Sequence, residues 1–433
     1  MKLQSLYSLV SILALTLSCH QPAGTTATLT APADLTVTDI TTSSATLNWK
    51  GSSPEALGYY VLVSTSAEPV AKLDADSASY TFNGLEADTE FRFGVQAYGK
   101  GYALSQIAWA PTVKTLTPDL DPNPVEAVTF EWTEVGGLSL PESVRVFKTE
   151  GTLSGRPLQA WYASADCTGD IQLKVLFPGL DSRKTIDDQS ASNSKCLVLV
   201  NGGVFGKFNN GLAVCDGEQT PWVRVEEDNW DIDRQYWGPD GKLHTVSRGM
   251  FGVNEKGVPG VWWSYTPSHG TVYVYDKPIP SVAGGQVQPG GTDTFPTTRA
   301  AWEPYNAITC GPVLLQSGKC PINDRKTPAG YWETNYELWA DDIYGVNVLA
   351  DRTAVGYRKD GSVILLIVDG RIDTSQGATT LEMAAIMKGL DCEGALNLDG
   401  GGSTGMWVKG GGHLNDTTGG NRAVLTTIGF FEK

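Results

Sequence analysis

Three stretches of the sequence place an acid or an amide directly after an apolar run and directly before glycine. Asn201 follows "LVLV", Asp369 follows "VILLIV" and Asp399 follows "ALNL". Glycine permits backbone conformations that other residues rarely adopt, so such turns let the main chain approach another group closely. Each turn alone also fits an ordinary tight turn. If the strand ends meet, two carboxylates and an amide converge on one cleft, which is a composition suited to acid–base chemistry.

The elements that must position these turns are mostly strands. In residues 32–117, apolar and polar residues alternate with period two in "LTVTDITTSSATLNWKG", "YYVLVST" and "TEFRFGVQAYG". This segment resembles a fibronectin type III domain, through Pro32, Trp49, Tyr60 and the alternation that begins at Phe91. The resemblance implies a β-sandwich that serves as a spacer or, alternatively, binds a ligand.

The rest of the chain predicts a linker followed by a larger domain. Residues 118–127 lie in an acidic, proline-containing segment and form the predicted linker. Residues 128–433 contain many apolar strand patterns and one clear helix pattern, "TTLEMAAIMKGL" at 379–390. The fold class that we predict is therefore α+β: an N-terminal β-sandwich followed by a larger, strand-rich, mixed α+β domain.

The N-terminus predicts export and a lipid anchor. Residues 1–18 combine a lysine with an apolar run too short for a stable membrane span, and Cys19 follows. This pattern resembles a bacterial lipoprotein signal, which implies cleavage before Cys19, lipidation of that cysteine and attachment to a membrane of the cell envelope. An ordinary secretory signal is the alternative. His20 after the cysteine favours the outer membrane of a Gram-negative cell, with residues 19–31 as a tether.

The composition and net charge of the chain limit the kinds of partner and cofactor that it can bind. The chain has 48 acidic and 32 basic residues, a net charge of −16, which disfavours nucleic acid as a partner. Export permits disulfides, and Cys310 and Cys320 bracket a strand-and-turn pattern that suits a local bridge. No cysteine or histidine spacing typical of a metal site occurs, so we expect no cofactor. The acid-rich stretches 74–79, 229–233 and 339–344 leave Ca²⁺ as an alternative.

Four motifs give the larger domain a specific resemblance. "NGGVF", "RTAVGYRKDGSVILLIVDGR", "SQGATTLEMAAIMKGL" and "ALNLDGGGSTGM" occur in this order and resemble the phosphodiester glycosidase family over most of residues 195–433. The resemblance implies an exported enzyme that hydrolyses a sugar, N-acetylglucosamine-like, from a sugar-1-phosphodiester or phosphoglycan. The alternatives are a surface glycan-binding lipoprotein without activity and the same chemistry acting in exopolysaccharide or envelope assembly.

This chemistry suggests catalytic roles for four residues. Cleavage at an anomeric carbon develops positive charge on the sugar, which Asp369 or Asp399 would stabilise or attack. The phosphate leaving group needs cationic donors, and Arg352 is the first candidate. Glu382 is the candidate second carboxylate. Because it follows Thr379 by three residues, it could instead cap the helix.

Further residues are candidates for substrate binding. The free N–H groups at the start of the 379–390 helix, after a turn at Gly377, suit a phosphate. The other candidates are backbone N–H groups of glycine turns, neutral hydrogen-bonding side chains and two further arginines. The full set is Asn201, Gly202, Gly311, Thr353, Gly370, Arg371, Gly377, Thr379, Asn397, Gly400, Gly401, Gly402, Ser403 and Arg422.

Overall fold

The computed structural model describes residues 27–322 and 348–433, except for 43, 52, 84, 86–87, 118–120, 181, 206–211, 221–234, 238–242, 246–247, 269–270, 276–281, 284–301 and 416–420. These residues fall into two compact units. The first is built from the chain up to Lys114, apart from residues 40–44 and 83–89, which group with the second. The second unit continues from Thr115 to the C-terminus.

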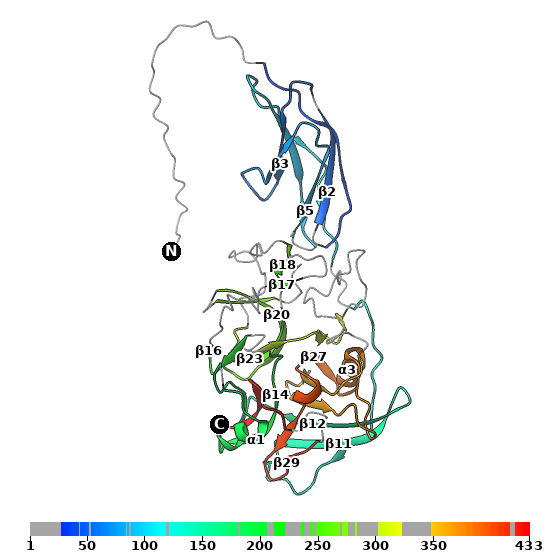
Figure 1. Cartoon of the computed structure of the whole chain (residues 1–433), viewed down its shortest axis with the longest axis vertical. Helices are drawn as coiled ribbons and strands as arrows, with labels where there is room; N and C mark the ends of the chain where they lie inside the picture. The colour runs from blue at the N-terminus through cyan, green and yellow to red at the C-terminus, as the bar shows by residue number, and fades with distance from the viewer. Residues whose placement is uncertain are drawn as a thin grey trace, which may run out of the picture. The chain divides into compact units, whose positions relative to one another are not determined.

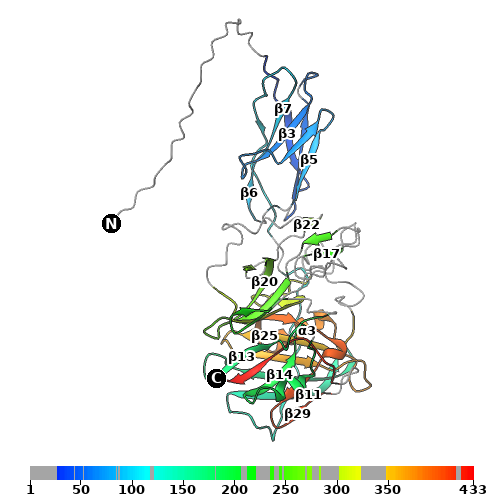
Figure 2. The same cartoon turned by 60° about the vertical axis from the view of Figure 1, so that its left-hand side comes forward.

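The first unit is all β (Figures 1 and 2). A three-stranded sheet (β1-β2-β5) and a four-stranded sheet (β4-β3-β7-β8) are accompanied by the short pair β6-β9. Aromatic side chains join the two larger sheets: Phe82 stacks on Phe93 with ring centroids 4.1 Å apart, and Trp49 meets Tyr59 edge-on at 5.7 Å. The strands are β1 (Ala33–Thr38), β2 (Ser44–Lys50), β3 (Gly58–Val63), β4 (Ala71–Asp74), β5 (Ser79–Asn83), β6 (Glu90–Phe91), β7 (Phe93–Tyr98), β8 (Ala108–Trp109) and β9 (Val113–Lys114).

The second unit contains four sheets. A seven-stranded sheet has the order β10-β11-β12-β26-β25-β27-β24 and a five-stranded sheet β13-β30-β14-β28-β29. A six-stranded sheet has the order β16-β15-β23-β19-β20-β21, and β17-β18-β22 form a small one. The strands up to β22 are β10 (Thr133–Glu134), β11 (Val144–Leu153), β12 (Arg156–Ala165), β13 (Ile171–Leu176), β14 (Cys196–Asn201), β15 (Ala213–Cys215), β16 (Glu218–Gln219), β17 (Gln235–Trp237), β18 (Leu243–Thr245), β19 (Arg248–Val253), β20 (Pro259–Ser268), β21 (Thr271–Tyr275) and β22 (Val282–Ala283). The remaining strands are β23 (Asn306–Cys310), β24 (Val313–Leu315), β25 (Arg352–Arg358), β26 (Val363–Val368), β27 (Cys392–Asn397), β28 (Met406–Val408), β29 (Gly412–His413) and β30 (Thr427–Glu432).

Strand β26 shows why the sequence of this unit contains continuous apolar runs. It lies between β12 and β25, and all six of its residues are buried. Val363, Leu365 and Ile367 enter the main hydrophobic cluster, which all three large sheets share. The alternate residues Ile364, Leu366 and Val368 enter a second cluster on the other face of the sheet. Because successive strand residues point to opposite faces, a strand that is buried on both faces must be apolar throughout.

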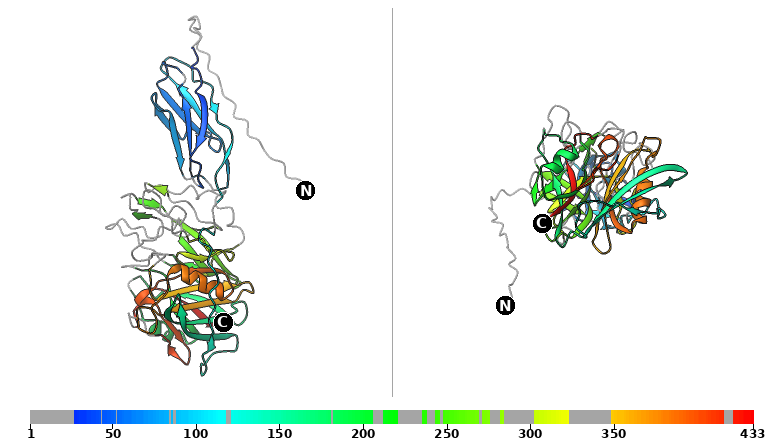
Figure 3. Two further views of the ribbon diagram at one scale, coloured as in Figure 1. Left: turned by 90° about the vertical axis from the view of Figure 1, so that its right-hand side faces the viewer. Right: turned by 90° about the horizontal axis from the view of Figure 1, so that it is seen from below.

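Helix α3 (Thr380–Gly389) covers that second face. Its buried side chains, among them Met383, Ile386 and Met387, pack in the second cluster, and the helix contacts β24, β25 and β27. Its orange ribbon is seen beside the sheet in Figure 3. Thr379 caps the helix as the sequence predicts: its hydroxyl accepts a hydrogen bond from the N–H of Glu382. The apolar helix face therefore shields the strands that carry the site residues.

The chain changes sheet directly after β27. This strand ends at Asn397 in the seven-stranded sheet, and β28 lies in the five-stranded sheet beside β14. A single 3₁₀ turn, η2 (Gly401–Ser403), joins them. The Asp399 turn is thus held between two sheets, next to the end of β14.

The predicted α+β class is confirmed only for its strands. The described residues hold one other α-helix, the short α1 (Ile186–Ala191), so the fold is mostly β. No helix in the described part of the chain is long and apolar enough to cross a membrane. The signal segment 1–18, Cys19 and His20, together with the stretches 229–233 and 339–344, lie outside the described residues, as does most of the 19–31 tether.

The expected Cys310–Cys320 disulfide is not formed. Cys310 packs in the main hydrophobic cluster, whereas Cys320 packs in the cluster beneath α3. Two cysteines whose side chains enter opposite faces of the structure cannot reach the short Cβ–Cβ separation that a disulfide needs. Their closeness in sequence was therefore a poor guide to pairing.

Candidate active site

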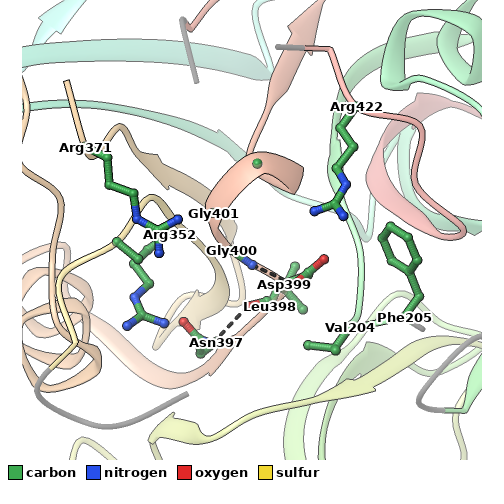
Figure 4. A pocket seen from close by; sticks show the side chains of 12 residues that line it. Val204, Phe205, Arg352, Arg371, Asn397, Leu398, Asp399, Gly400, Gly401 and Arg422 are labelled. Carbon is green, nitrogen blue, oxygen red and sulfur yellow. Dashed lines mark hydrogen bonds between the residues drawn. The ribbon is translucent and has the colours of Figure 1, made fainter. Parts of the chain in front are cut away.

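A pocket with a volume of about 310 Å³ opens around the Asp399 turn (Figure 4). Segments that are far apart in sequence meet there: the chain after β14, the start of β25, the turn after β26 and the end of β27. Its lining consists of Val204, Phe205, Ala350, Arg352, Arg371, Asn397, Leu398, Asp399, Gly400, Gly401, Gly402 and Arg422. Asp399 is the only carboxylate in this set.

The backbone of Asp399 is fixed from both sides. Its N–H donates to the carbonyl of Gly202 at 3.0 Å, and its own carbonyl accepts from Nδ2 of Asn201 at 2.7 Å. The carboxylate Oδ1 accepts from the N–H of Gly400 at 2.9 Å. Two of these contacts hold the backbone of Asp399 and one holds its carboxylate before any ligand arrives, as a preorganised reactive group requires.

Burial raises the pKa of Asp399 to about 6. The Ser403 hydroxyl, the Gly400 N–H and the charge of Arg422 oppose this rise without cancelling it. A carboxyl group with a pKa near 6 changes its protonation state close to neutral pH. Such a group can serve as a base, an acid or a nucleophile under ordinary conditions.

Arg352 and Arg371 form one cationic side of the pocket. Arg352 is 3% exposed, and it donates from Nε to the Ala378 carbonyl at 3.1 Å and from Nη2 to the Val348 carbonyl at 2.6 Å. Its Nη1 has no hydrogen-bond partner among the described residues. Burial and the neighbouring charge of Arg371 lower the pKa of Arg352 to about 10, against the opposing effect of Asp351, so it stays protonated at neutral pH.

Arg371 holds an unusual backbone conformation. Its φ is +60°, a left-handed value that costs a non-glycine residue roughly 1 kcal/mol. This conformation directs the side chain over the glycine turn, where Nη1 lies 3.4 Å from the position that a Cβ on Gly401 would take. The strain is compatible with a functional site, where such outliers concentrate.

The other side of the pocket carries Arg422 and Phe205. The guanidinium of Arg422 lies 5.7 Å from the centroid of the Phe205 ring, within the range of a cation–π contact. In Figure 4, Arg352 and Arg371 lie on one side of Asp399, and Arg422 with Phe205 on the other. Asp399 therefore stands between cations.

The glycines after Asp399 serve the turn itself as well as the pocket. A Cβ on Gly400 would lie 2.7 Å from the backbone carbonyl of Asp351, and the N–H of Gly401 donates to that same carbonyl at 2.9 Å. Gly401 has φ +57°. The close approach that the sequence predicted is thus first an approach to the protein's own backbone, while one face of the turn lines the pocket.

Asn397 presents a hydrogen-bond acceptor to the pocket. Its Nδ2 donates to the carbonyls of Gly311 at 3.0 Å and Leu398 at 2.9 Å, which fixes the orientation of the amide. Oδ1 is buried and has no hydrogen-bond partner within the described structure. A buried acceptor without a partner is costly. The pocket therefore favours a ligand that donates a hydrogen bond at this point.

Several predicted binding residues position the pocket and do not line it. The side chain of Asn201 is fully buried, and its Oδ1 accepts from the Thr353 hydroxyl at 2.6 Å and from the Gly405 N–H at 3.2 Å. With Nδ2 bound to Asp399, the amide of Asn201 has nothing left for a substrate. Gly202, Gly311, Gly370 and Ser403 are likewise outside the lining, although Gly202 and Gly311 accept hydrogen bonds from Asp399 and Asn397.

Glu382 belongs to the cap of helix α3, which the sequence analysis gave as the alternative to a catalytic role. Its Oε2 accepts from the Thr379 N–H at 2.9 Å, and its Oε1 accepts from Arg156 at 2.6 Å and from Ser154 at 2.8 Å. Burial raises the pKa of Glu382, but these hydrogen bonds outweigh it and leave the pKa below its usual value. The capping box also occupies the helix N-terminus. Gly377 packs on the backbone of Ala350, and neither Gly377 nor Thr379 lines the pocket around Asp399.

Asp369 follows the same sequence pattern as Asp399 but does not reach the pocket. Its side chain is fully buried, and Oδ1 accepts from Nδ2 of Asn415 at 2.9 Å. The structure therefore brings together Arg352, Arg371, Asn397, Asp399, the glycines 400–402 and Arg422 from the predicted set. Phe205, Val204, Ala350 and Leu398 were not predicted. The first two stand in the quoted "NGGVF" motif, so that motif carried the signal.

Comparison with known families gives the class of the protein. A model of the phosphodiester glycosidase family matches residues 241–431, and a model of the fibronectin type III domain matches residues 30–109. The chain contains a phosphodiester glycosidase domain and a fibronectin type III domain. The first match begins after Asn201–Phe205, so it is shorter than the resemblance drawn from the motifs.

Individual relatives cover smaller parts of the chain. The uncharacterized SPbeta prophage-derived protein YomE of Bacillus subtilis is 39% identical over 90 residues, 21% of this chain. The N-acetylglucosamine-1-phosphodiester alpha-N-acetylglucosaminidase of Bos taurus is 35% identical over 108 residues, 25% of this chain. The chain spans only 13% and 20% of the length of these two curated relatives. The solved catalytic domain of the zebrafish N-acetylglucosamine-1-phosphodiester alpha-N-acetylglucosaminidase aligns with a TM-score of 0.45 at 21% identity, over 71% of this chain and 89% of that chain.

Proposed function

We propose that the protein hydrolyses a sugar-1-phosphodiester at the anomeric carbon and releases a sugar, N-acetylglucosamine-like in shape. The observation that carries this proposal is the single carboxylate, Asp399, placed between arginines in one pocket. A carboxylate can stabilise the positive charge that develops on the sugar. Arginine can stabilise the departing phosphate.

The proposed reaction divides the work between the two kinds of side chain. Nη1 of Arg352 and the guanidinium of Arg371 bind phosphate oxygens, while ionised Asp399 faces the anomeric carbon. The bond between that carbon and the bridging oxygen breaks, and its electrons leave with the phosphate monoester. Water supplies the new hydroxyl of the sugar and, through Asp399, the proton that the reaction releases. Because the leaving phosphate is a weak base, the reaction needs no second carboxylate as an acid.

The decisive experiment identifies the bond that breaks. An N-acetylglucosamine-1-phosphodiester is incubated with the protein in ¹⁸O-labelled water, and the products are analysed by mass spectrometry and NMR. We expect the label in the sugar and none in the phosphate, with the product anomer giving retention or inversion. Label in the phosphate would show cleavage on the wrong side of the bridging oxygen and would overturn the proposal.

Two variants separate catalysis from binding. Asp399→Asn keeps the shape of the side chain and should abolish turnover, whereas Asp373→Asn, at an exposed acid in the turn after β26, should leave turnover unchanged. Binding of the phosphodiester by the wild-type protein without any turnover would favour the alternative of a surface glycan-binding protein. Faster turnover of a polymeric phosphoglycan than of a simple diester would favour a role in envelope or exopolysaccharide assembly.

We also propose that Cys19 anchors the protein to a membrane of the cell envelope through lipid, with the fibronectin type III domain as a spacer. The support is the sequence of residues 1–19. Metabolic labelling with a fatty acid tests this directly. Label that survives in a Cys19→Ala variant would contradict the anchor.

A further inference from the structure

The pocket carries more positive charge than a simple phosphodiester neutralises. Three of its lining residues are arginines and one is a carboxylate, in a chain whose net charge is −16. Within the described residues, none of Arg352, Arg371 and Arg422 forms an ion pair. A phosphodiester has one negative charge. With Asp399 ionised, one positive charge of the lining remains unbalanced after such a ligand binds.

The positive charge is divided between two places. Arg352 and Arg371 line the pocket on one side of Asp399, and Arg422 lines it on the other (Figure 4). Figure 4 shows the two groups on opposite sides of the Asp399 carboxylate. A ligand with two acidic groups can place one on each side of the carboxylate.

A further arginine adds positive charge beside Arg422. Arg183 stacks on the ring of Phe205 at 4.9 Å from its centroid, so this ring contacts both Arg183 and Arg422. A bridge between Lys184 and Val424 joins the two segments, with N–H···O distances of 3.1 and 2.9 Å. The backbone therefore holds two guanidinium groups at one half-buried aromatic residue of the pocket wall.

We propose that the natural substrate carries two acidic groups: the phosphodiester, held by Arg352 and Arg371, and a second phosphate or carboxylate, held by Arg183 and Arg422 beside Phe205. This inference rests on the proposed function and names the class of its substrate. Charge-assisted hydrogen bonds to arginine suit both acids. Repeating anionic glycans have this character, because each sugar-1-phosphate unit lies next to another charged unit. The second acid sits on the sugar or on the group across the phosphate.

Calorimetry tests the second acidic group without any reliance on turnover. The probes are propane-1,3-diol mono(methyl phosphate) and propane-1,3-diol bis(methyl phosphate), in which each phosphodiester carries one negative charge. We expect wild-type protein to bind the probe with two phosphodiesters about tenfold more tightly, as one added charge-assisted contact would give. Arg183→Gln and Arg422→Gln should remove most of this difference. Lys184→Gln removes an exposed charge from the neighbouring residue without touching Phe205 and should preserve it.

Turnover then locates the second acid and keeps the two proposals apart. N-acetylglucosamine-1-phosphodiesters are compared that carry no further acid, a 6-phosphate on the sugar, or a phosphate on the other side of the diester. We expect one acidic substrate to exceed the neutral one in kcat/KM, and the advantage to vanish in Arg422→Gln. Equal affinity of wild-type protein for both calorimetric probes, or an advantage that survives in both arginine variants, would overturn the inference. Failure of all three substrates would instead count against the proposed function.

Discussion

Replacing Asp399 by asparagine should make the protein more stable at neutral pH while it destroys the site. The pKa of this carboxyl is about 6 in the folded protein, against an ordinary value of 3.8. The folded state therefore binds the proton more tightly than the unfolded state. The stability that this proton contributes is fully present below about pH 4 and is lost as the pH rises through about 6. Above that pH, folding must keep a carboxylate charged in a place that disfavours charge.

The magnitude follows from the size of the shift. A difference of about two pKa units corresponds to roughly 3 kcal/mol, and partial contact of the side chain with solvent reduces this to about 1–2 kcal/mol. Asparagine retains an oxygen to accept the hydrogen bond from Gly400. We therefore expect Asp399→Asn to raise the free energy of unfolding by about 1–2 kcal/mol near neutral pH, and by close to zero below about pH 4.

Guanidinium chloride unfolding of both proteins at neutral and acid pH, followed by tryptophan fluorescence, measures this difference. Asp360→Asn is a control of opposite sign. Hydrogen bonds from the hydroxyl and N–H of Ser362 lower the pKa of Asp360, so its neutral substitute should gain no stability. Equal stability of wild-type protein and Asp399→Asn at neutral pH would refute the reasoning, as would a gain of the same size at both pH values.

Four further predictions follow from the same geometry. If Asp399 acts as a carboxylate, kcat/KM should fall below about pH 6 with an apparent pKa near 6, and a rate that is flat down to about pH 4.5 would exclude this role. Glu382→Gln should lower the free energy of unfolding by about 1 kcal/mol through loss of the ion pair with Arg156, and Glu382→Ala by about 1–2 kcal/mol because the helix cap is lost as well. Both variants should keep kcat/KM within about threefold of wild type. If activity falls further than the folded fraction measured by circular dichroism, Glu382 has a catalytic role. Arg371→Gly should be about 1 kcal/mol more stable than Arg371→Ala in thermal unfolding, because glycine adopts φ +60° without strain. Both variants should lower kcat by about 10²-fold or more. Equal stability of the two variants would mean that the turn is not strained. Asn201→Ala should destabilise the protein by about 2–3 kcal/mol in chemical unfolding because it strands the buried hydroxyl of Thr353, and it should lower kcat by displacing Asp399; unchanged kcat would show that Asn201 does not position the carboxylate.

The sequence predicted the local elements of the larger domain well because their signals are local. The run "VILLIV" gives β26 at Val363–Val368, and the helix predicted at 379–390 is α3, which begins after the cap at Thr379. The cap needs only residues three apart, and the strand needs only a run of apolar residues. The same reasoning left the role of Glu382 undecided, since its competing partner, Arg156, lies 226 positions earlier in the chain.

The sequence could not distinguish Asp369 from Asp399. Both follow a buried strand and precede glycine, yet Asn415, 46 residues further on, covers Asp369, while the chain at Asp399 passes from one sheet to another and opens toward the pocket. Asn201 illustrates the same limit. Its position after β14 was recognised, but the partners that consume its amide come from β25 and from the turns at Asp399 and Gly405. Such contacts depend on how sheets pack.

Three buried free cysteines can report where the fold opens. Burial raises the pKa of Cys167, Cys196 and Cys392 to about 12, so at neutral pH only about one thiol in 10⁵ is a reactive thiolate. They lie in three separate hydrophobic clusters: Cys167 in the main cluster, Cys392 in the cluster beneath α3, and Cys196 in a small cluster that includes Val424 and against which Phe205 packs. An alkylating reagent applied under native conditions would therefore label each cysteine only when its own region exposes it. Mass spectrometry of the labelled peptides would rank the three regions by how often each unfolds locally. It would show whether the segments that carry Arg183 and Arg422 open before the sheets that support Asp399.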